Sequence, residues 1–258
     1  MGFRFQQTRH GGEGKEVWYL DSVTLKGPAV EAPDQPSTPT ASERASQSIT
    51  LNWDSMEGVT DYIIQRSHGG EFQQVGRVPA YKTTYEDHGL VANKSYLYRV
   101  QAVNQSGSSD PGLSNVFETL TQKRDWQKQN FDNPDGPDAN LYAVDALGIP
   151  NLLRFAFNSP PGQGLRQANY DRQSGGTPLV THEPNGHQRI EFNRRRPESN
   201  PGITYVLECS NDLKSWHAVA PDYTAELLDD QFEWIRWMGT TASGPRFYRV
   251  IVKDNPEN

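Results

Sequence analysis

Apolar and polar residues alternate along three short segments in the first half of the chain, residues 48–53, 61–66 and 96–103. Alternate residues of a β-strand share one face, so Ile49 and Trp53 are expected to point the same way. Large apolar side chains from separate strands are buried together when two sheets stack. The pattern therefore predicts a mainly β protein with a β-sandwich here. Its predicted structural core is Trp53, Tyr62, Ile64, Leu90, Tyr96, Tyr98 and Val100.

The same segments resemble a known family. Leu90 followed by Tyr96 matches a tyrosine corner, in which the phenol bonds back to upstream backbone. With the Trp53 strand and a run from Tyr98 to Gly107, these residues are similar to a fibronectin type III domain over about residues 33–121. The resemblance implies an immunoglobulin-like sandwich. It does not define a ligand, because such sandwiches carry many unrelated functions.

Composition and charge restrict the partners. A chain of 258 residues is long enough for two or more domains, and a 34% apolar content favours several small cores. The net charge of −7 argues against nucleic acid and against an anionic membrane surface. The chain has no apolar run of about 18 residues, so we expect no membrane insertion. We expect a monomer, with a polysaccharide or a cell-surface protein as its partner.

The N-terminal part is predicted to contain two strands separated by a Gly-rich turn, within residues 1–27. This hairpin resembles the last hairpin of bacterial jelly-roll modules of the carbohydrate-binding or laminin-G-like kind. In several such families an Asp matching Asp21 ligates calcium. We therefore expect residues 1–27 to be the end of a truncated β-sandwich module. A linker rich in Pro, Ala, Ser and Thr, residues 28–42, is predicted to follow and to lead into the sandwich.

Residues 122–161 are predicted to form a helical connector with an acidic loop. The loop leads into a predicted helix in which positions 149, 152, 153 and 156 have helical apolar spacing. The helix resembles the one that follows a calcium loop, related to thrombospondin type 3 and dockerin loops, in secreted bacterial proteins. The loop departs from the Asp-Gly-Asp-Gly core of that family at residues 145–148, and Arg154 replaces the usual Glu. The resemblance suggests calcium as a cofactor, whereas the alternative is an acidic turn without metal. The candidate calcium ligands are Asp132, Asp135, Asp138 and Asp145.

The last part, residues 162–258, is predicted to be a second β-sandwich-like domain. Strands are expected near 189–193, 204–210, 231–238 and 246–252. The segment from Tyr205 to Trp216 and the final run Arg246 to Val250 resemble the terminal β-domain of secreted bacterial proteins. No activity is associated with that resemblance.

Patterns that suggest catalysis or metal binding are weak. His182 and His187 are five residues apart, whereas a helical zinc motif needs four. Asp229 and Asp230 are adjacent rather than opposed across a cleft. The cluster Arg194–Arg196 is interpreted as a solvated turn. The single cysteine, Cys209, is interpreted as a structural strand residue, so we predict no catalytic residues and no enzyme.

These observations predict a non-catalytic accessory, spacer and adhesion region of a secreted multi-domain bacterial protein. Carbohydrate or cell-surface association would be its function. The alternative is an accessory tail of a polysaccharide-active hydrolase or sulfatase whose catalytic domain lies upstream. No carbohydrate-binding residues are assigned from the sequence, but four indoles are candidates for stacking on sugars: Trp18, Trp216, Trp234 and Trp237.

Overall fold

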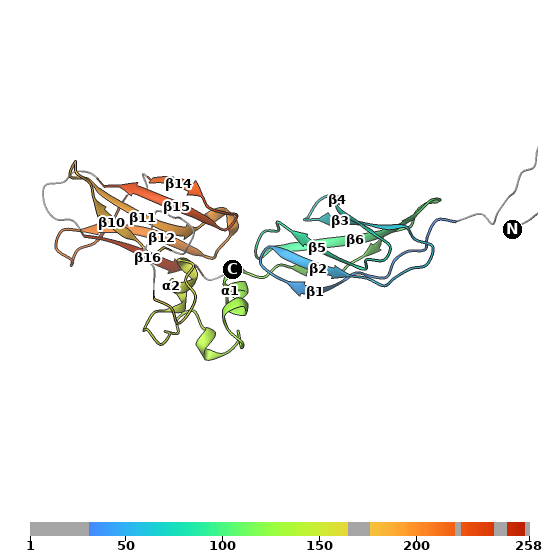
Figure 1. The fold of residues 1–258 in the computed structure, drawn as a ribbon, viewed down its shortest axis with the longest axis horizontal. Helices are drawn as coiled ribbons and strands as arrows, with labels where there is room; N and C mark the ends of the chain where they lie inside the picture. The colour runs from blue at the N-terminus through green and yellow to red at the C-terminus, as the bar shows by residue number, and fades with distance from the viewer. Residues whose placement is uncertain (1–30, 165–175, 220–222, 240–246, 256–258) are drawn as a thin grey trace, which may run out of the picture. The chain divides into compact units, whose positions relative to one another are not determined.

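The computed structural model describes residues 31–164, 176–219, 223–239 and 247–255 (Figure 1). The chain divides into two compact units, Met1–Glu31 and Ala32–Asn258. The hairpin predicted over residues 1–27, with Trp18 and Asp21, lies outside the described residues. Within the second unit the structure is mainly β, as the sequence predicted.

The first sandwich is formed by two antiparallel sheets. One contains β1 (Thr40–Arg44), β2 (Ser48–Asn52) and β5 (Thr84–His88), in the order β1-β2-β5. The other has the order β4-β3-β6-β7, with β3 (Asp61–Ser67), β4 (Gln73–Pro79), β6 (Ser95–Asn104) and β7 (Gly107–Ser108). Two further short strands, β8 (Gly112–Leu113) and β9 (Phe117–Glu118), also pair with β6.

The interior of this sandwich contains all seven residues of the predicted core, each at most 6% exposed. The Trp53 indole meets the Tyr62 ring edge-on, with 5.4 Å between the ring centroids. The Tyr96 hydroxyl accepts a hydrogen bond of 2.9 Å from the backbone N–H of Val91, five residues upstream. This bond is the contact that defines a tyrosine corner.

The second set of sheets is here called the C-terminal sheets. One has the order β10-β11-β15-β14, from β10 (Leu179–His182), β11 (Gln188–Arg195), β14 (Tyr223–Leu227) and β15 (Phe232–Met238). The other has the order β13-β12-β16, from β12 (Ile203–Ser210), β13 (His217–Ala218) and β16 (Phe247–Asp254). Apolar residues of both sheets, such as Phe192 and Ile203, share one core.

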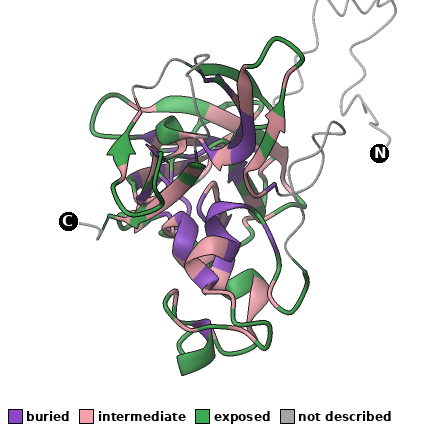
Figure 2. Cartoon of the chain, turned by 90° about the vertical axis from the view of Figure 1, so that its left-hand side faces the viewer, coloured by how far each residue is buried: buried purple, intermediate pink, exposed green. Residues whose placement is uncertain are grey.

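Two helices belong to that same core. Helix α1 (Gln122–Asn130) begins at Thr121, whose hydroxyl accepts from the backbone N–H of Arg124. Trp126 of α1 lies in the core beside Phe155 of α2 (Asn151–Ala156). Short 3₁₀ turns, η1 (Pro137–Ala139) and η2 (Pro197–Ser199), complete the described elements. Figure 2 shows buried positions on the helices and strands, and exposed ones on the outer loops.

The interior face of α2 contains expected apolar positions together with a charged residue. Ala156 is fully buried in the core, and Leu152 and Leu153 pack against it while half-buried. Arg154 is fully buried as well, because its guanidinium is held by polar partners inside the fold, the Asp145 carboxylate and the Ser159 hydroxyl. A buried charge is tolerated when it is paired and hydrogen-bonded.

The prediction of a solvated turn at Arg194–Arg196 is wrong, because the first two of these arginines continue β11. Arg195 is buried between the rings of Phe155 and Phe232, at 3.9 and 4.5 Å from their centroids. Its guanidinium donates to the Phe155 carbonyl and to the side-chain oxygen of Gln122. Burial lowers the pKa of Arg195 to about 10, so the side chain is still charged at neutral pH.

Candidate functional site

The four aspartates proposed as calcium ligands are not gathered into one group. Asp135 forms an ion pair of 2.8 Å with Arg124, and Asp138 belongs to the short turn η1. Within the described ranges, no three His, Cys, Asp or Glu side chains are close enough together to hold a metal ion. The calcium site accordingly stays a prediction. The environment of Asp145 suggests how this prediction can be tested.

Asp145 is already surrounded by donors. Its carboxylate accepts from the backbone N–H groups of Leu147, Ile149 and Gly162 and from the Arg154 guanidinium. Burial opposes the charge, but these hydrogen bonds outweigh it and lower the pKa of Asp145 to about 2. The guanidinium therefore supplies the positive charge that a bound cation would otherwise provide.

The residues of the apparent zinc motif lie at a hairpin turn. His182 ends β10, and the backbone N–H of Glu183 donates to the carbonyl of His187 across the turn. The Glu183 carboxylate pairs with Arg189 at 2.7 Å, and the His187 ring nitrogen Nδ1 contacts the Gly239 carbonyl. The two imidazoles therefore do not share a helix face, as the Pro and Gly in the segment indicated.

The three described tryptophans among the sugar-stacking candidates have different environments. Trp234 and Trp237 are buried, at 3% and 6% exposed, so their rings are not available on the surface and the expectation is wrong for both. Trp216 is half-buried beyond the end of β12. The Arg249 guanidinium lies over its ring, 4.1 Å from the centroid, and is paired with Glu208 at 2.7 Å.

Trp216 is positioned by a tight polar turn. The Asp212 carboxylate accepts from the backbone N–H groups of Lys214 and Ser215, both at 2.8 Å. These bonds are the main reason that the pKa of Asp212 is lowered to about 2. Leu213 has a left-handed φ of 62°, and its carbonyl accepts from the Trp216 indole N–H.

The turn borders a polar hollow of about 390 Å³, lined by Cys209, Ser210, Asn211, Asp212, Ser215 and His217. Trp216 stacks instead against Arg249, which is paired in register with Glu208, whereas Cys209 and His217 of the hollow lie on the other face of that sheet. We refer to Trp216, Arg249 and Glu208 as the Trp216 surface. It combines one large ring with a guanidinium and a carboxylate. Such groups hydrogen-bond neutral polar ligands, and a ring supplies a flat apolar contact.

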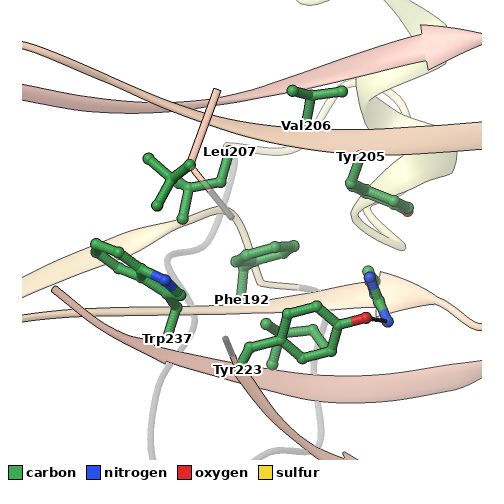
Figure 3. Close-up of a pocket in the computed structure, with 9 residues that line it drawn as sticks. Phe192, Tyr205, Val206, Leu207, Tyr223 and Trp237 are labelled. Carbon is green, nitrogen blue, oxygen red and sulfur yellow. Dashed lines mark hydrogen bonds between the residues drawn. The ribbon is translucent and has the colours of Figure 1, made fainter. Parts of the chain in front are cut away.

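A second hollow lies within the C-terminal sheets and was not predicted from the sequence. It has a volume of about 370 Å³ and is called the aromatic cavity (Figure 3). Its lining comes from both sheets and the segments beside them: Phe192, Arg194, Tyr205, Val206, Leu207, Val219, Tyr223, Ile235 and Trp237. In Figure 3 the Trp237 ring and Leu207 lie at one end of the view, and Tyr205 lies at the other.

The polar groups of the aromatic cavity are held in place by hydrogen bonds. Arg194 donates through Nε to Glu233 at 2.7 Å and through Nη2 to the Tyr223 hydroxyl at 2.6 Å. Burial acts against the charge of Arg194, but these two partners outweigh it and raise the pKa. The Tyr205 hydroxyl donates to the Ala156 carbonyl, so Tyr205 contributes mainly its ring.

Comparison with known proteins identifies part of the chain. Residues 34–118 match the family model of the fibronectin type III domain, and this segment is a fibronectin type III domain. The resemblance inferred from the Trp53 strand and the Tyr96 corner is therefore confirmed. Domains of this kind are typically non-catalytic. The match covers the first sandwich and does not reach α1 or the C-terminal sheets.

The curated relatives include two bacterial enzymes. Chitinase 63 of Streptomyces plicatus is 33% identical over 97 residues, which is 36% of this chain and 15% of that protein. Chitinase C of Streptomyces lividans is 32% identical over 104 residues, 39% of this chain and 16% of that protein. The chain thus spans about 15% of the length of these chitinases.

Among solved structures, domains A168–A170 of titin match at 27% identity with a TM-score of 0.32. The match covers 34% of this chain and 32% of the titin chain. In the described residues no helix is long and apolar enough to cross a membrane.

Proposed function

We propose that this chain is a non-catalytic accessory region of a secreted, polysaccharide-active protein. Its fibronectin type III domain acts as a spacer, and the C-terminal sheets associate with carbohydrate. The observation that carries the proposal is the fibronectin type III domain at residues 34–118, because segments about one third identical occur in two Streptomyces chitinases. Those proteins act on a polysaccharide by name, which favours an upstream hydrolase over an unrelated adhesin.

The Trp216 surface is the part of the described structure best suited to carbohydrate. Sugars present apolar ring faces and many hydroxyl groups. The exposed part of the half-buried Trp216 ring offers an apolar contact to the former, and the Arg249 guanidinium and Glu208 carboxylate offer a donor and an acceptor to the latter. The Arg249–Glu208 pair is partly exposed and adds charged hydrogen-bonding groups at the edge.

The test is retention on insoluble polysaccharides, with chitin, cellulose and xylan compared side by side. The full chain should be retained on at least one of them, and Trp216→Ala should lose most of the retention because it removes the stacking ring. Tyr81→Ala is the matched control, since Tyr81 is 82% exposed on the fibronectin type III domain. Absence of retention on all three matrices, or equal loss in both variants, would count against the proposed surface.

A further inference from the structure

The aromatic cavity is a further candidate for ligand binding, separate from the Trp216 surface in the residues that form it. The described residues that line it do not include Trp216, Arg249 or Glu208. Its volume of about 370 Å³ lies within the range of pockets that hold small molecules, roughly 300–1,000 Å³. Such pockets combine mainly apolar and aromatic walls with a few placed polar groups, and this lining has the same character.

The walls consist of rings and aliphatic side chains held by the strands. Phe192 and Ile235 are directly paired residues of β11 and β15, and Tyr223 and Trp237 are directly paired residues of β14 and β15. Residues paired across neighbouring strands project on the same side of a sheet. The opposite wall is formed by Tyr205 and Leu207, two positions apart on β12, as Figure 3 shows.

The charges of the lining select for an uncharged ligand. Among the described residues of the lining, Arg194 is the one that is charged, and its charge is balanced by Glu233 at 2.7 Å. An anionic ligand would have to compete with that carboxylate, and a cationic ligand meets no carboxylate among the lining residues that the structure describes. Desolvating an ion without a partner is costly, so a neutral molecule fits the site.

The polar end of the cavity selects for a hydrogen-bond acceptor. The Tyr223 hydroxyl oxygen accepts from Arg194, which leaves the hydroxyl proton to be donated to a ligand. The Arg194 guanidinium also lies over the Tyr223 ring, 4.5 Å from its centroid, which holds both groups in place. We propose that the aromatic cavity binds a neutral, flat aromatic molecule with a carbonyl or ether oxygen directed at Tyr223.

Coumarin and naphthalene are suitable probes, because both are flat, neutral and bicyclic, and only coumarin carries acceptor oxygens. Saturation-transfer difference NMR on the full chain should detect coumarin at about 1 mM or below. Val219→Trp places an indole in the lining and should abolish the signal. Val180→Trp is the matched control on β10, at a residue 40% exposed and outside the lining, and should leave binding unchanged.

Tyr223→Phe separates the hydrogen bond from the apolar contact. It keeps the ring and removes the hydroxyl, so coumarin should bind roughly three- to tenfold more weakly while naphthalene binding is unchanged. This comparison decides the question even if Val219→Trp fails to fold. The proposal is overturned if coumarin does not bind, if Val219→Trp binds it as well as the wild type, or if Tyr223→Phe weakens both probes equally.

Discussion

At the scale of single residues, hydrogen-bonded polar groups hold the two sheets of the first sandwich together from the inside. The Tyr98 hydroxyl, on β6, donates to the Asp87 carboxylate, on β5, at 2.8 Å. Arg66, on β3, pairs with the same carboxylate at 2.8 Å. Burial and the neighbouring carboxylate raise the pKa of Tyr98, so this phenol stays protonated. The two sheets are therefore joined by a buried hydrogen bond and an ion pair as well as by apolar contacts.

Two substitutions in this sandwich separate packing from hydrogen bonding. Trp53→Ala removes a ring that is 6% exposed, so it should cost about 3–5 kcal/mol of unfolding free energy. Tyr96→Phe keeps its ring but leaves the Val91 N–H without its acceptor, so it should cost about 1–3 kcal/mol. Urea melts of the full chain compare the two. An unchanged midpoint in Trp53→Ala would disprove the assigned core.

Arg154 gives a direct test of the calcium prediction. Since its guanidinium already contacts Asp145, titration calorimetry with millimolar calcium should give no binding heat for the wild type. Arg154→Glu removes that cation and places a carboxylate near Asp145, so it should lower the melting temperature. Arg154→Lys, which keeps the charge, is the matched control and should be less damaging. A binding heat in the wild type that disappears in Asp145→Asn would show that the loop holds calcium after all.

The limits of sequence-based inference are clearest for charged residues. Apolar core positions such as Ile64 and Val100 follow from strand alternation, because apolar side chains gain most from burial. Arg195 and Asp87 were missed because charged residues are usually exposed, and their burial depends on partners distant in the sequence. The aromatic cavity was missed because its walls come from strands of both sheets, which are distant in the sequence.

At the scale of elements, the long strands of the C-terminal sheets were predicted and a short edge strand was not. The strands β11, β12, β15 and β16 correspond to four predicted segments, with boundaries shifted by a few residues. The strand β14 was not predicted, although Tyr223, Ala225 and Leu227 alternate with polar residues, because it is only five residues long and lies at a sheet edge where each residue is exposed. An edge strand buries little and so carries a weaker hydrophobic signal.

Two loop carboxylates should make stability depend on acid pH. The pKa values of Asp145 and Asp212 are both lowered from about 3.8 to about 2 by hydrogen bonds in the folded state. Their stabilisation is therefore complete above about pH 4 and is lost as the pH falls towards 2. Urea midpoints measured across this range should fall, and the fall should be smaller in Asp145→Asn and Asp212→Asn. A fall of equal size in both variants and the wild type would contradict the assignment.

At the scale of the whole molecule, the described residues contain two separate hydrophobic cores. One belongs to the fibronectin type III domain around Trp53, and the other joins α1, α2 and the C-terminal sheets around Phe155. The two clusters have no residue in common. Removal of side chains from different cores should therefore have independent effects.

A double substitution tests this independence. Phe155→Ala should lower the free energy of unfolding by about 3–5 kcal/mol, since the ring is fully buried. The loss of unfolding free energy that Phe155→Ala causes in the second core should be the same in the wild-type background and in the Trp53→Ala background, within about 0.5 kcal/mol. Hydrogen exchange followed by mass spectrometry reports the two regions separately. If Phe155→Ala also increased exchange in β2 and β6, the two cores would have to be treated as one cooperative unit.

The proposal that the C-terminal sheets associate with carbohydrate through Trp216 is tested most directly by NMR titration of the labelled full chain. Soluble chitin and cellulose oligosaccharides would be added while indole and backbone N–H signals are followed. We expect the largest shifts at the Trp216 indole, at Glu208 and at Arg249, with the signals of the fibronectin type III domain unchanged. Shifts confined to residues 34–118, or none with any oligosaccharide, would contradict the proposed role of these sheets.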